Sequence, residues 1–211
     1  MISKEAQKSI KRFKRAASFI GFLVKSPKEM TPRRLRIGRL FNNLQGTVFP
    51  KVKGTTKEVI YLDDIRSFKI STPNSDPERI LLYFHGGGYS LGSPESHYSL
   101  ASYLADITKT VVYVPDYRLG PEYKFPAQLE DGVKSYKFLI DNLGYAPEQV
   151  AISGDSAGGH LALITLLKLK EDGAKWKSND KKKAGIIYDS GDIIIEAPDK
   201  DGASREGVKR Q

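Results

Sequence analysis

The sequence predicts an α/β fold built around a doubly wound, mostly parallel sheet, and three observations lead to this prediction. Short apolar runs at 80–84, 110–114 and 150–153 have the composition of buried strands. A helical pattern follows each run, and this alternation is typical of parallel sheets with helices on both faces. Glycine-rich segments come directly after the first and third runs, at the strand ends where such folds keep their functional sites.

A pair of strands is expected before the core of the sheet. Glu58–Leu62 and Ile65–Ile70 are separated by Asp63-Asp64, and this spacing predicts a hairpin-like pair. A turn cluster at 72–77, which contains two prolines, precedes the buried strand that starts at Arg79. The core of the sheet is therefore expected to begin at this strand.

Helices are expected on both sides of the later strands. The patterns place them at 93–108, 127–143 and 157–169, and the second one ends where glycine and proline follow. A shorter basic helical piece, at 31–40, precedes the sheet and begins with a proline. It is either a gate over the site or a solvated linker helix.

The segment Gly154-Asp155-Ser156-Ala157-Gly158 lies between the last predicted strand and its helix. A Gly-x-Ser-x-Gly pattern in this position predicts a nucleophile elbow, because a serine hydroxyl must be held out on a sharp turn to attack a substrate. We therefore predict that Ser156 is the nucleophile. The N-terminus of the following helix directs N–H groups towards a developing oxyanion, so the Ala157 N–H is an expected donor.

A second glycine-rich segment, His85-Gly86-Gly87-Gly88-Tyr89, follows the strand at 80–84. Its backbone can present N–H groups to a substrate without obstruction by side chains. His85 is expected to brace this loop through a hydrogen bond rather than to accept a proton. The loop and the elbow fit a single site.

These two motifs, together with the segments at 114–122 and 125–131, resemble the hormone-sensitive lipase family of α/β-hydrolases (α/β-hydrolase fold-3). The resemblance covers residues 79–172, where the motifs occur in the order and spacing of the family. It implies an α/β-hydrolase fold and a serine carboxylic-ester hydrolase of the esterase or lipase type, acting through an acyl-enzyme on Ser156. The expected partner is a small acyl ester.

The resemblance also implies roles for particular residues. Gly87, Gly88 and Ala157 would supply the oxyanion hole, and Asp155 would support the elbow turn. Asp116 and Glu122 are expected to take part in structural bonding. No substrate-binding residue is assigned.

The family also has an aspartate and a histidine late in the chain, and here this sequence departs from the pattern. No histidine follows His160, and His160 lies on the elbow helix, where its side chain should lean away from Ser156. His97 has no predicted role. We name no base and no acid, and expect an apparently C-terminally truncated hydrolase with little activity as this chain alone. The alternative is a non-catalytic homologue that acts as a binding or membrane-surface protein.

Composition narrows the function further. The chain has 211 residues and a net charge of +9, to which residues 1–60 contribute +12 (15 Lys and Arg against 3 acids) and the remaining residues −3. A basic segment attached to a near-neutral domain suggests a surface-attached arm or an anionic partner, whereas nucleic-acid binding would be suggested by a uniformly basic domain and is not expected here. The sequence contains no cysteine, and its three histidines are scattered, so we predict no metal site. No cofactor is expected.

An amphipathic helix is predicted near the start of the chain, with lysine and arginine on its polar face. It either caps the active site or lies on an anionic membrane surface. Its apolar run, 16–24, is too short to span a bilayer. We expect a cytoplasmic protein, associated with membranes if this helix binds them. Its apolar positions, three or four residues apart, are Ile2, Ala6, Ile10, Phe13, Ala17, Ile20 and Val24.

These patterns divide the chain into three predicted parts. Residues 1–57 form a basic helical N-terminal or cap segment, and residues 58–190 form an incomplete α/β-hydrolase core with C-terminal strands missing. Residues 191–211 form a predicted disordered tail, which after a short apolar run at 192–196 is polar and contains glycine from Pro198 to Gln211.

Overall fold

The computed structural model of the chain describes residues 31–173, 185–189 and 192–196. The chain divides into two compact units, residues 1–36 and 37–211. This division lies earlier than the predicted boundary at residue 57. Helix α2 (Pro32–Val48) begins in the first unit and continues in the second, and it is longer than the predicted piece. The amphipathic helix predicted from Ile2 to Val24 lies outside the described residues.

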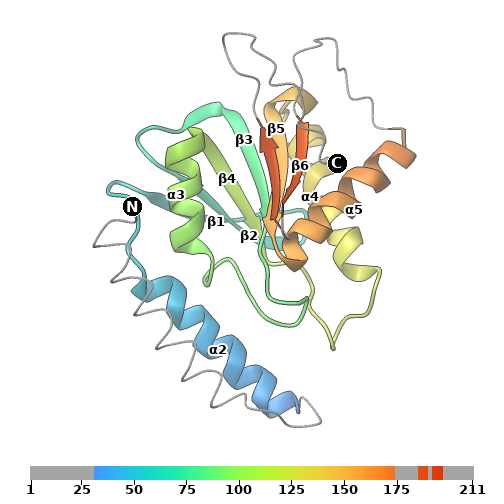
Figure 1. The fold of residues 1–211 in the computed structure, drawn as a ribbon. Helices are drawn as coiled ribbons and strands as arrows, with labels where there is room; N and C mark the ends of the chain where they lie inside the picture. Colours follow the sequence, from blue (N-terminus) through green and yellow to red (C-terminus); the bar gives the residue numbers. More distant parts are fainter. Residues whose placement is uncertain (1–30, 174–184, 190–191, 197–211) are drawn as a thin grey trace, which may run out of the picture. The chain divides into compact units, whose positions relative to one another are not determined.

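The second unit is built on one mixed sheet with the strand order β1-β2-β4-β3-β5-β7-β6 (Figure 1). Parallel pairing occurs in its centre, where β3 lies between β4 and β5. The other described pairs are antiparallel. The strands are β1 (Thr56–Leu62), β2 (Ile65–Ser71), β3 (Asp76–Phe84), β4 (Thr110–Pro115), β5 (Val150–Asp155), β6 (Gly185–Asp189) and β7 (Asp192–Glu196).

The sheet is mixed rather than mostly parallel because a hairpin lies at each end of it. Two-residue connections join β1 to β2 and β6 to β7, and so short a connection permits only antiparallel pairing. The predicted early pair of strands is confirmed, with Leu62 paired to Ile65 across the turn. At the other end, β7 pairs with Gly154 and Asp155 of β5. Strand β7 occupies part of the stretch predicted as a disordered tail, whose other residues lie outside the described ones.

Helices cover both faces of the central strands, as the predicted alternation of strands and helices requires (Figure 1). Helix α3 (Tyr98–Thr108) packs on one face, and helices α4 (Ala127–Asp141) and α5 (Ala157–Glu171) pack on the other. A 3-10 turn, η1 (Pro147–Gln149), leads into β5. Helix α3 starts later than predicted, because the residues from Ser93 to His97 form a turn in which Ser93 and Ser96 bond each other.

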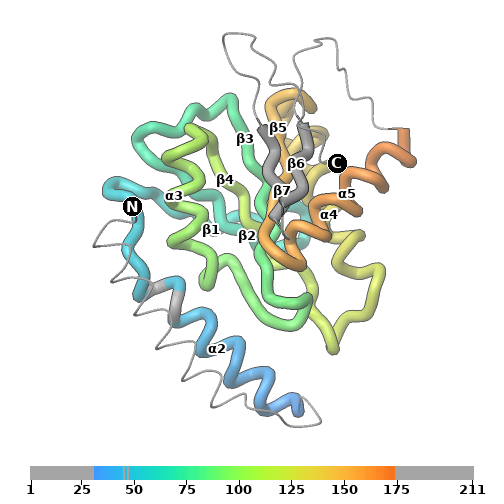
Figure 2. Tube along the Cα trace, viewed as in Figure 1, coloured from blue at the N-terminus to red at the C-terminus, as the bar shows by residue number. Residues whose placement is uncertain are grey.

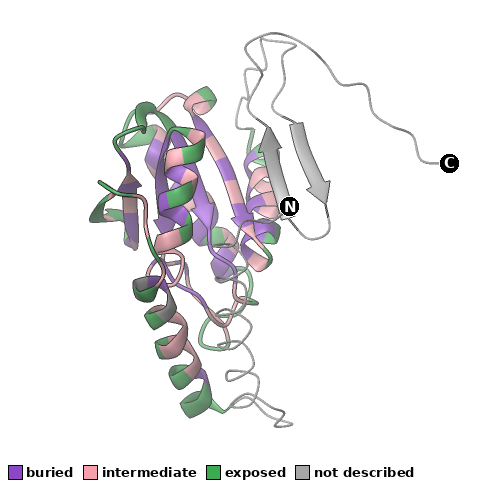
Figure 3. Cartoon of the chain, turned by 60° about the vertical axis from the view of Figure 1, so that its left-hand side comes forward, coloured by how far each residue is buried: buried purple, intermediate pink, exposed green. Residues whose placement is uncertain are grey.

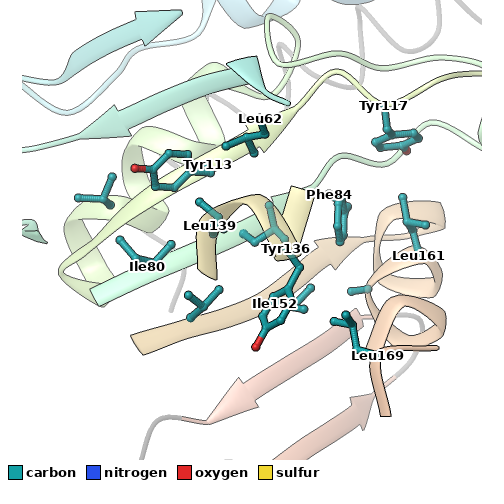
Figure 4. Packing of buried hydrophobic residues seen from close by; sticks show 14 residues of the cluster. Leu62, Ile80, Phe84, Tyr113, Tyr117, Tyr136, Leu139, Ile152, Leu161 and Leu169 are labelled. Carbon is teal, nitrogen blue, oxygen red and sulfur yellow. The ribbon is translucent and has the colours of Figure 1, made fainter. Parts of the chain in front are cut away.

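The core follows from the alternation of side chains along β3. Ile80, Leu82 and Phe84 belong to the cluster beneath α4 and α5, whereas Leu81 and Tyr83 belong to the cluster beneath α3. The central strands are accordingly the most buried part of the fold (Figure 3). Figure 4 shows the larger cluster, in which side chains from the strands meet those of α4 and α5.

This packing places two distant segments side by side. Strands β3 and β5 run parallel and adjacent, with Phe84 paired to Gly154 at their carboxyl ends (Figure 2). The glycine-rich loop leaves β3 at this point, and the Gly-x-Ser-x-Gly turn leaves β5 beside it. The fold therefore brings both motifs to one edge of the sheet.

Candidate active site

Ser156 occupies the strand-to-helix turn between β5 and α5. Its backbone has φ 50° and ψ −118°, a region that residues other than glycine rarely adopt. The side chain is exposed, and its hydroxyl makes no hydrogen bond within the described residues. The turn therefore presents a free hydroxyl on a strained backbone, the arrangement expected of a nucleophile elbow.

The two glycines that flank Ser156 allow the backbone to approach very closely. A Cβ atom on Gly158 would lie 1.9 Å from the carbonyl oxygen of Phe84, and one on Gly154 would lie 2.4 Å from the carbonyl carbon of Gly158. Any side chain at either position would force β3, β5 and α5 apart. The spacing of the motif thus follows from packing as well as from chemistry.

The glycine loop reverses direction through successive residues with positive φ. Gly87 and Gly88 have φ of 123° and 60°, and Tyr89 follows with 58°. A Cβ atom on Gly87 would lie 2.3 Å from the carbonyl oxygen of Leu91, whereas one on Gly88 would meet no atom within 4 Å. The space beside Gly88 is therefore open. Within the described residues, the N–H groups of Gly87, Gly88 and Ala157 have no hydrogen-bond acceptor.

Asp155 connects the elbow to the glycine loop. Its Oδ1 atom accepts hydrogen bonds from the Gly86 N–H and the Tyr83 hydroxyl, both at 2.8 Å, and lies 3.4 Å from His97 Nε2. Burial alone would raise the pKa of this carboxyl group. The contact with His97 and its electrostatic attraction, with the two hydrogen bonds, outweigh burial and lower the pKa of Asp155 to about 2. The residue before the nucleophile is therefore a fixed carboxylate.

His85, the first residue of the glycine loop, is fully buried. Its ring stacks on Tyr117 with centroids 4.3 Å apart, its Nδ1 lies 3.0 Å from the Gly86 oxygen, and its own carbonyl accepts a hydrogen bond from the Tyr117 hydroxyl. Burial lowers the pKa of His85 to about 3, so its ring is neutral at physiological pH. This geometry suits a brace for the loop.

His160 lies on the exposed side of α5 and contacts the end of the glycine loop. Its Nδ1 atom lies 2.7 Å from the Tyr89 hydroxyl, and the two rings meet edge to face. Burial raises the pKa of Tyr89 to about 12, so this phenol stays protonated at neutral pH. The pair therefore connects α5 to the end of the glycine loop.

A family model described as the alpha/beta hydrolase fold matches residues 81–203, which is more than half of the chain. The chain is an α/β-hydrolase. An esterase from the bacterial hormone-sensitive lipase family is a structural neighbour with a TM-score of 0.66 and 31% identity, covering 77% of this chain and 53% of that one. These likenesses confirm the predicted fold and its resemblance to hormone-sensitive lipases.

Curated relatives of this α/β-hydrolase carry related names. An acetyl-hydrolase from Streptomyces hygroscopicus is 45% identical over 101 residues, covering 48% of this chain and 33% of the relative. The carboxylesterase/phospholipase LipF of Mycobacterium tuberculosis is 31% identical over 162 residues, covering 75% of this chain and 41% of the relative. The chain thus covers 33% and 41% of the lengths of these two relatives.

The structure of this α/β-hydrolase also shows contacts that the sequence did not reveal. His97 and Tyr83 contact Asp155 of the elbow, and the Tyr117 hydroxyl donates to the His85 carbonyl oxygen. Arg39 of α2 donates to the carbonyl oxygen of Ser90, the residue that follows the glycine loop. Tyr117 lies in the segment 114–122, which contributed to the family resemblance. The residues next to His97, Tyr83 and Arg39 in the sequence give no sign of these contacts. Their partners lie far away in the chain.

The acidic residues that were assigned to structural bonding have basic partners. Glu122 pairs with Arg39, and Asp116 lies 3.8 Å from Arg66. Burial raises the pKa of Asp116, and the opposite charge of Arg66 only partly offsets this effect. Neither carboxylate contacts the elbow through these bonds.

Within the described part of the α/β-hydrolase, no group of three or more histidine and acidic side chains is placed to hold a metal ion. None of the helices among the described residues is both long enough and apolar enough to cross a bilayer. An open surface hollow of about 370 Å³ lies along α4, beside Asp63 and Lys134. Its lining contains no residue of the elbow or the glycine loop, so it does not identify the substrate pocket.

Proposed function

We propose that this α/β-hydrolase cleaves small carboxylic esters through an acyl-enzyme on Ser156. The observation that carries the proposal is the exposed Ser156 hydroxyl, held at positive φ beside a loop with unpaired N–H groups. In the reaction, the serine oxygen attacks the ester carbonyl, the alcohol leaves, and water then releases the acid.

The proposed oxyanion hole consists of the N–H groups of Gly87, Gly88 and Ala157. Their lack of acceptors within the described residues supports this role, because donors for a transition state must be free in the resting site. The N-terminus of α5 adds its positive dipole end at Ala157. Asp155 and His85 are proposed as supporting residues that fix the loop and the turn.

The proton of Ser156 requires a base, and the three histidines of the chain are directed elsewhere in the described geometry. His85 is buried against Tyr117, His97 faces Asp155, and His160 contacts Tyr89. We propose that this chain alone is therefore slow, because removing a base from such a site leaves only the oxyanion and binding contributions. Those contributions still depend on Ser156.

A small acyl group is proposed because the names of several relatives indicate one. An acetyl-hydrolase, a putative acetyl-hydrolase LipR and an arylacetamide deacetylase are among the similar proteins. These names describe reactions at short acyl groups. We extend that chemistry to this chain as part of the proposal.

The test is chemical rescue of ester hydrolysis in the intact 211-residue chain. Free imidazole added to the assay with p-nitrophenyl butyrate should raise the protein-dependent rate, since it supplies a base that none of the three histidines provides in the described geometry. The Ser156→Ala variant should remove this increase, whereas Ser153→Ala, a control on the same strand, should keep it. Equal rates for wild type and Ser156→Ala, with and without imidazole, would contradict the proposal.

The alternative is a non-catalytic binding or membrane-surface protein, which the basic excess of residues 1–60 favours. A basic amphipathic segment should attach to anionic vesicles and lose that attachment in high salt. Co-sedimentation with anionic and neutral liposomes tests this alternative. Equal recovery of the protein in both supernatants would exclude the membrane-surface role.

A further inference from the structure

His97 faces the carboxylate behind the nucleophile. It lies at the start of α3, and its side chain is 16% exposed. Its Nε2 atom is 3.4 Å from Asp155 Oδ1, within ion-pair range. The elements packed around it contribute two more titratable rings, His85 at 5.4 Å and Tyr83 at 6.5 Å between centroids. Among the described residues, His97 is the basic side chain that contacts Asp155.

The other side of the His97 ring is fixed by its own turn. Its Nδ1 atom lies 2.8 Å from Ser96 Oγ and 3.3 Å from the Ser93 oxygen. Ser93 is held in turn, because its hydroxyl donates to Asn43 Oδ1 of α2 at 2.7 Å. These contacts hold one edge of the ring and leave Nε2 directed at Asp155.

The contact matters because of what Asp155 holds. The same Oδ1 atom accepts the Gly86 N–H, and Gly86 is followed directly by the two glycines of the proposed oxyanion hole. A Cβ atom on Gly86 would lie 2.2 Å from Asp155 Oδ2, so the carboxylate and the loop are in close contact. If the carboxylate moved away from this position, the Gly86 N–H would lose its acceptor and Gly86 would no longer be held.

We propose that His97 is a positioning residue for the oxyanion loop, which it fixes by holding the Asp155 carboxylate against Gly86. This inference rests on the proposed function of Gly87 and Gly88. His97 touches no reacting atom, so it acts through Asp155 on the geometry of the N–H donors. Because an oxyanion hole binds the transition state more strongly than the substrate, loss of His97 lowers kcat and leaves KM nearly unchanged.

The Gly86 amide provides a direct readout that does not depend on turnover. The sequence contains a single His-Gly pair, His85-Gly86. Labelling the histidine carbonyl carbon with ¹³C and the glycine nitrogen with ¹⁵N therefore selects the amide signal of Gly86 alone. Hydrogen exchange of this amide reports whether its bond to Asp155 persists. Loss of a hydrogen bond to a charged group should accelerate exchange about tenfold.

Three variants separate the donor role from a role in packing. His97→Phe keeps a ring but has no donor, so it should show the accelerated Gly86 exchange. His97→Gln places a side-chain amide N–H near the position that Nε2 occupies in the wild type, so it should restore slow exchange of the Gly86 amide. Leu100→Phe, on the exposed side of the same helix, should resemble the wild type. A folded His97→Phe protein with unchanged Gly86 exchange would overturn the proposal.

A measurement on the wild type covers the case in which His97→Phe does not fold. Long-range proton–nitrogen spectra of the imidazole show which ring nitrogen carries hydrogen. The proposal requires hydrogen on Nε2, and a bare Nε2 would overturn it. If hydrolysis by every variant is independent of Ser156, the proposed function fails, while the Gly86 signal still decides the role of His97.

Discussion

Arg39 of α2 donates two parallel hydrogen bonds to Glu122. They run from Arg39 Nη1 to Glu122 Oε1 and from Arg39 Nη2 to Glu122 Oε2, and each is 2.8 Å long. The same guanidinium donates to the carbonyl oxygens of Ser90 and Gly120, both at 2.9 Å. Gly120 in turn donates to the Tyr89 oxygen at 2.7 Å. A single arginine thus joins the end of the glycine loop to the segment after β4.

Arg39→Ala should therefore destabilise the fold. The substitution removes bonds to two backbone carbonyls and a planar pair with Glu122, and we expect a loss of about 1 to 3 kcal/mol in the free energy of unfolding. Urea denaturation measures the loss. Arg79→Ala, at an exposed arginine of β3, is the control and should change stability by less than about 0.5 kcal/mol. Equal effects of the two variants would contradict this role of Arg39.

Gly158→Ala should be among the most damaging single substitutions in the chain. The new Cβ atom would lie 1.9 Å from the Phe84 oxygen, so β3 and α5 must separate, at a cost of about 3 kcal/mol or more. Gly144→Ala provides the comparison. The φ of 76° at Gly144 would strain the backbone of any other residue, but an added Cβ atom would meet no neighbour within 4 Å. That strain alone should cost about 1 kcal/mol. Thermal melting that ranks the two variants in the opposite order would refute the packing argument.

Ser156→Gly should stabilise the protein while it removes the nucleophile. A residue other than glycine at φ 50° carries backbone strain, and glycine relieves about 1 kcal/mol of it. Ser156→Ala keeps the Cβ atom and the strain, so it should match the wild type in denaturation midpoint. A Ser156→Gly protein that is less stable than Ser156→Ala would show that the turn is not strained.

The sequence predicted the elbow and the glycine loop well because their demands are local. A backbone that needs positive φ or close approach requires glycine at fixed positions, and Gly87 and Gly158 meet these demands in the structure. The roles of particular residues within that site remain predictions. Long-range contacts left no such mark, since Arg39 and Glu122 are separated by 83 positions in the chain.

Which strands form the sheet, and in which direction they pair, was harder to predict for a related reason. Apolar runs indicate burial but do not reveal which strands pair or in which direction. The run at 192–196 lies in a polar segment, and its partner Gly154 is far away in the sequence. Strand β7 was therefore not expected. His97 went unassigned for the same reason, because its partner Asp155 belongs to another strand of the sheet.

His85 should make the stability of the protein depend on pH in mildly acidic solution. Its pKa is lowered by burial to about 3 in the folded chain, against about 6.5 for an unperturbed histidine. Between these values the unfolded chain binds more protons than the folded one, so acid favours unfolding. The contribution of His85 is fully present above about pH 6.5 and is lost as the pH falls towards 3, with a slope of up to about 1.4 kcal/mol per pH unit.

Urea denaturation between pH 7 and pH 5 measures this slope, and two substitutions identify its source. His85→Gln removes the titrating group and should flatten the dependence, even though it lowers stability at every pH through lost packing against Tyr117. His160→Gln, at the exposed histidine of α5, should leave the slope of the wild type unchanged. His85 produces the slope because its buried ring would have to carry the positive charge without contact with water. A slope that persists in His85→Gln would assign the acid sensitivity to another group.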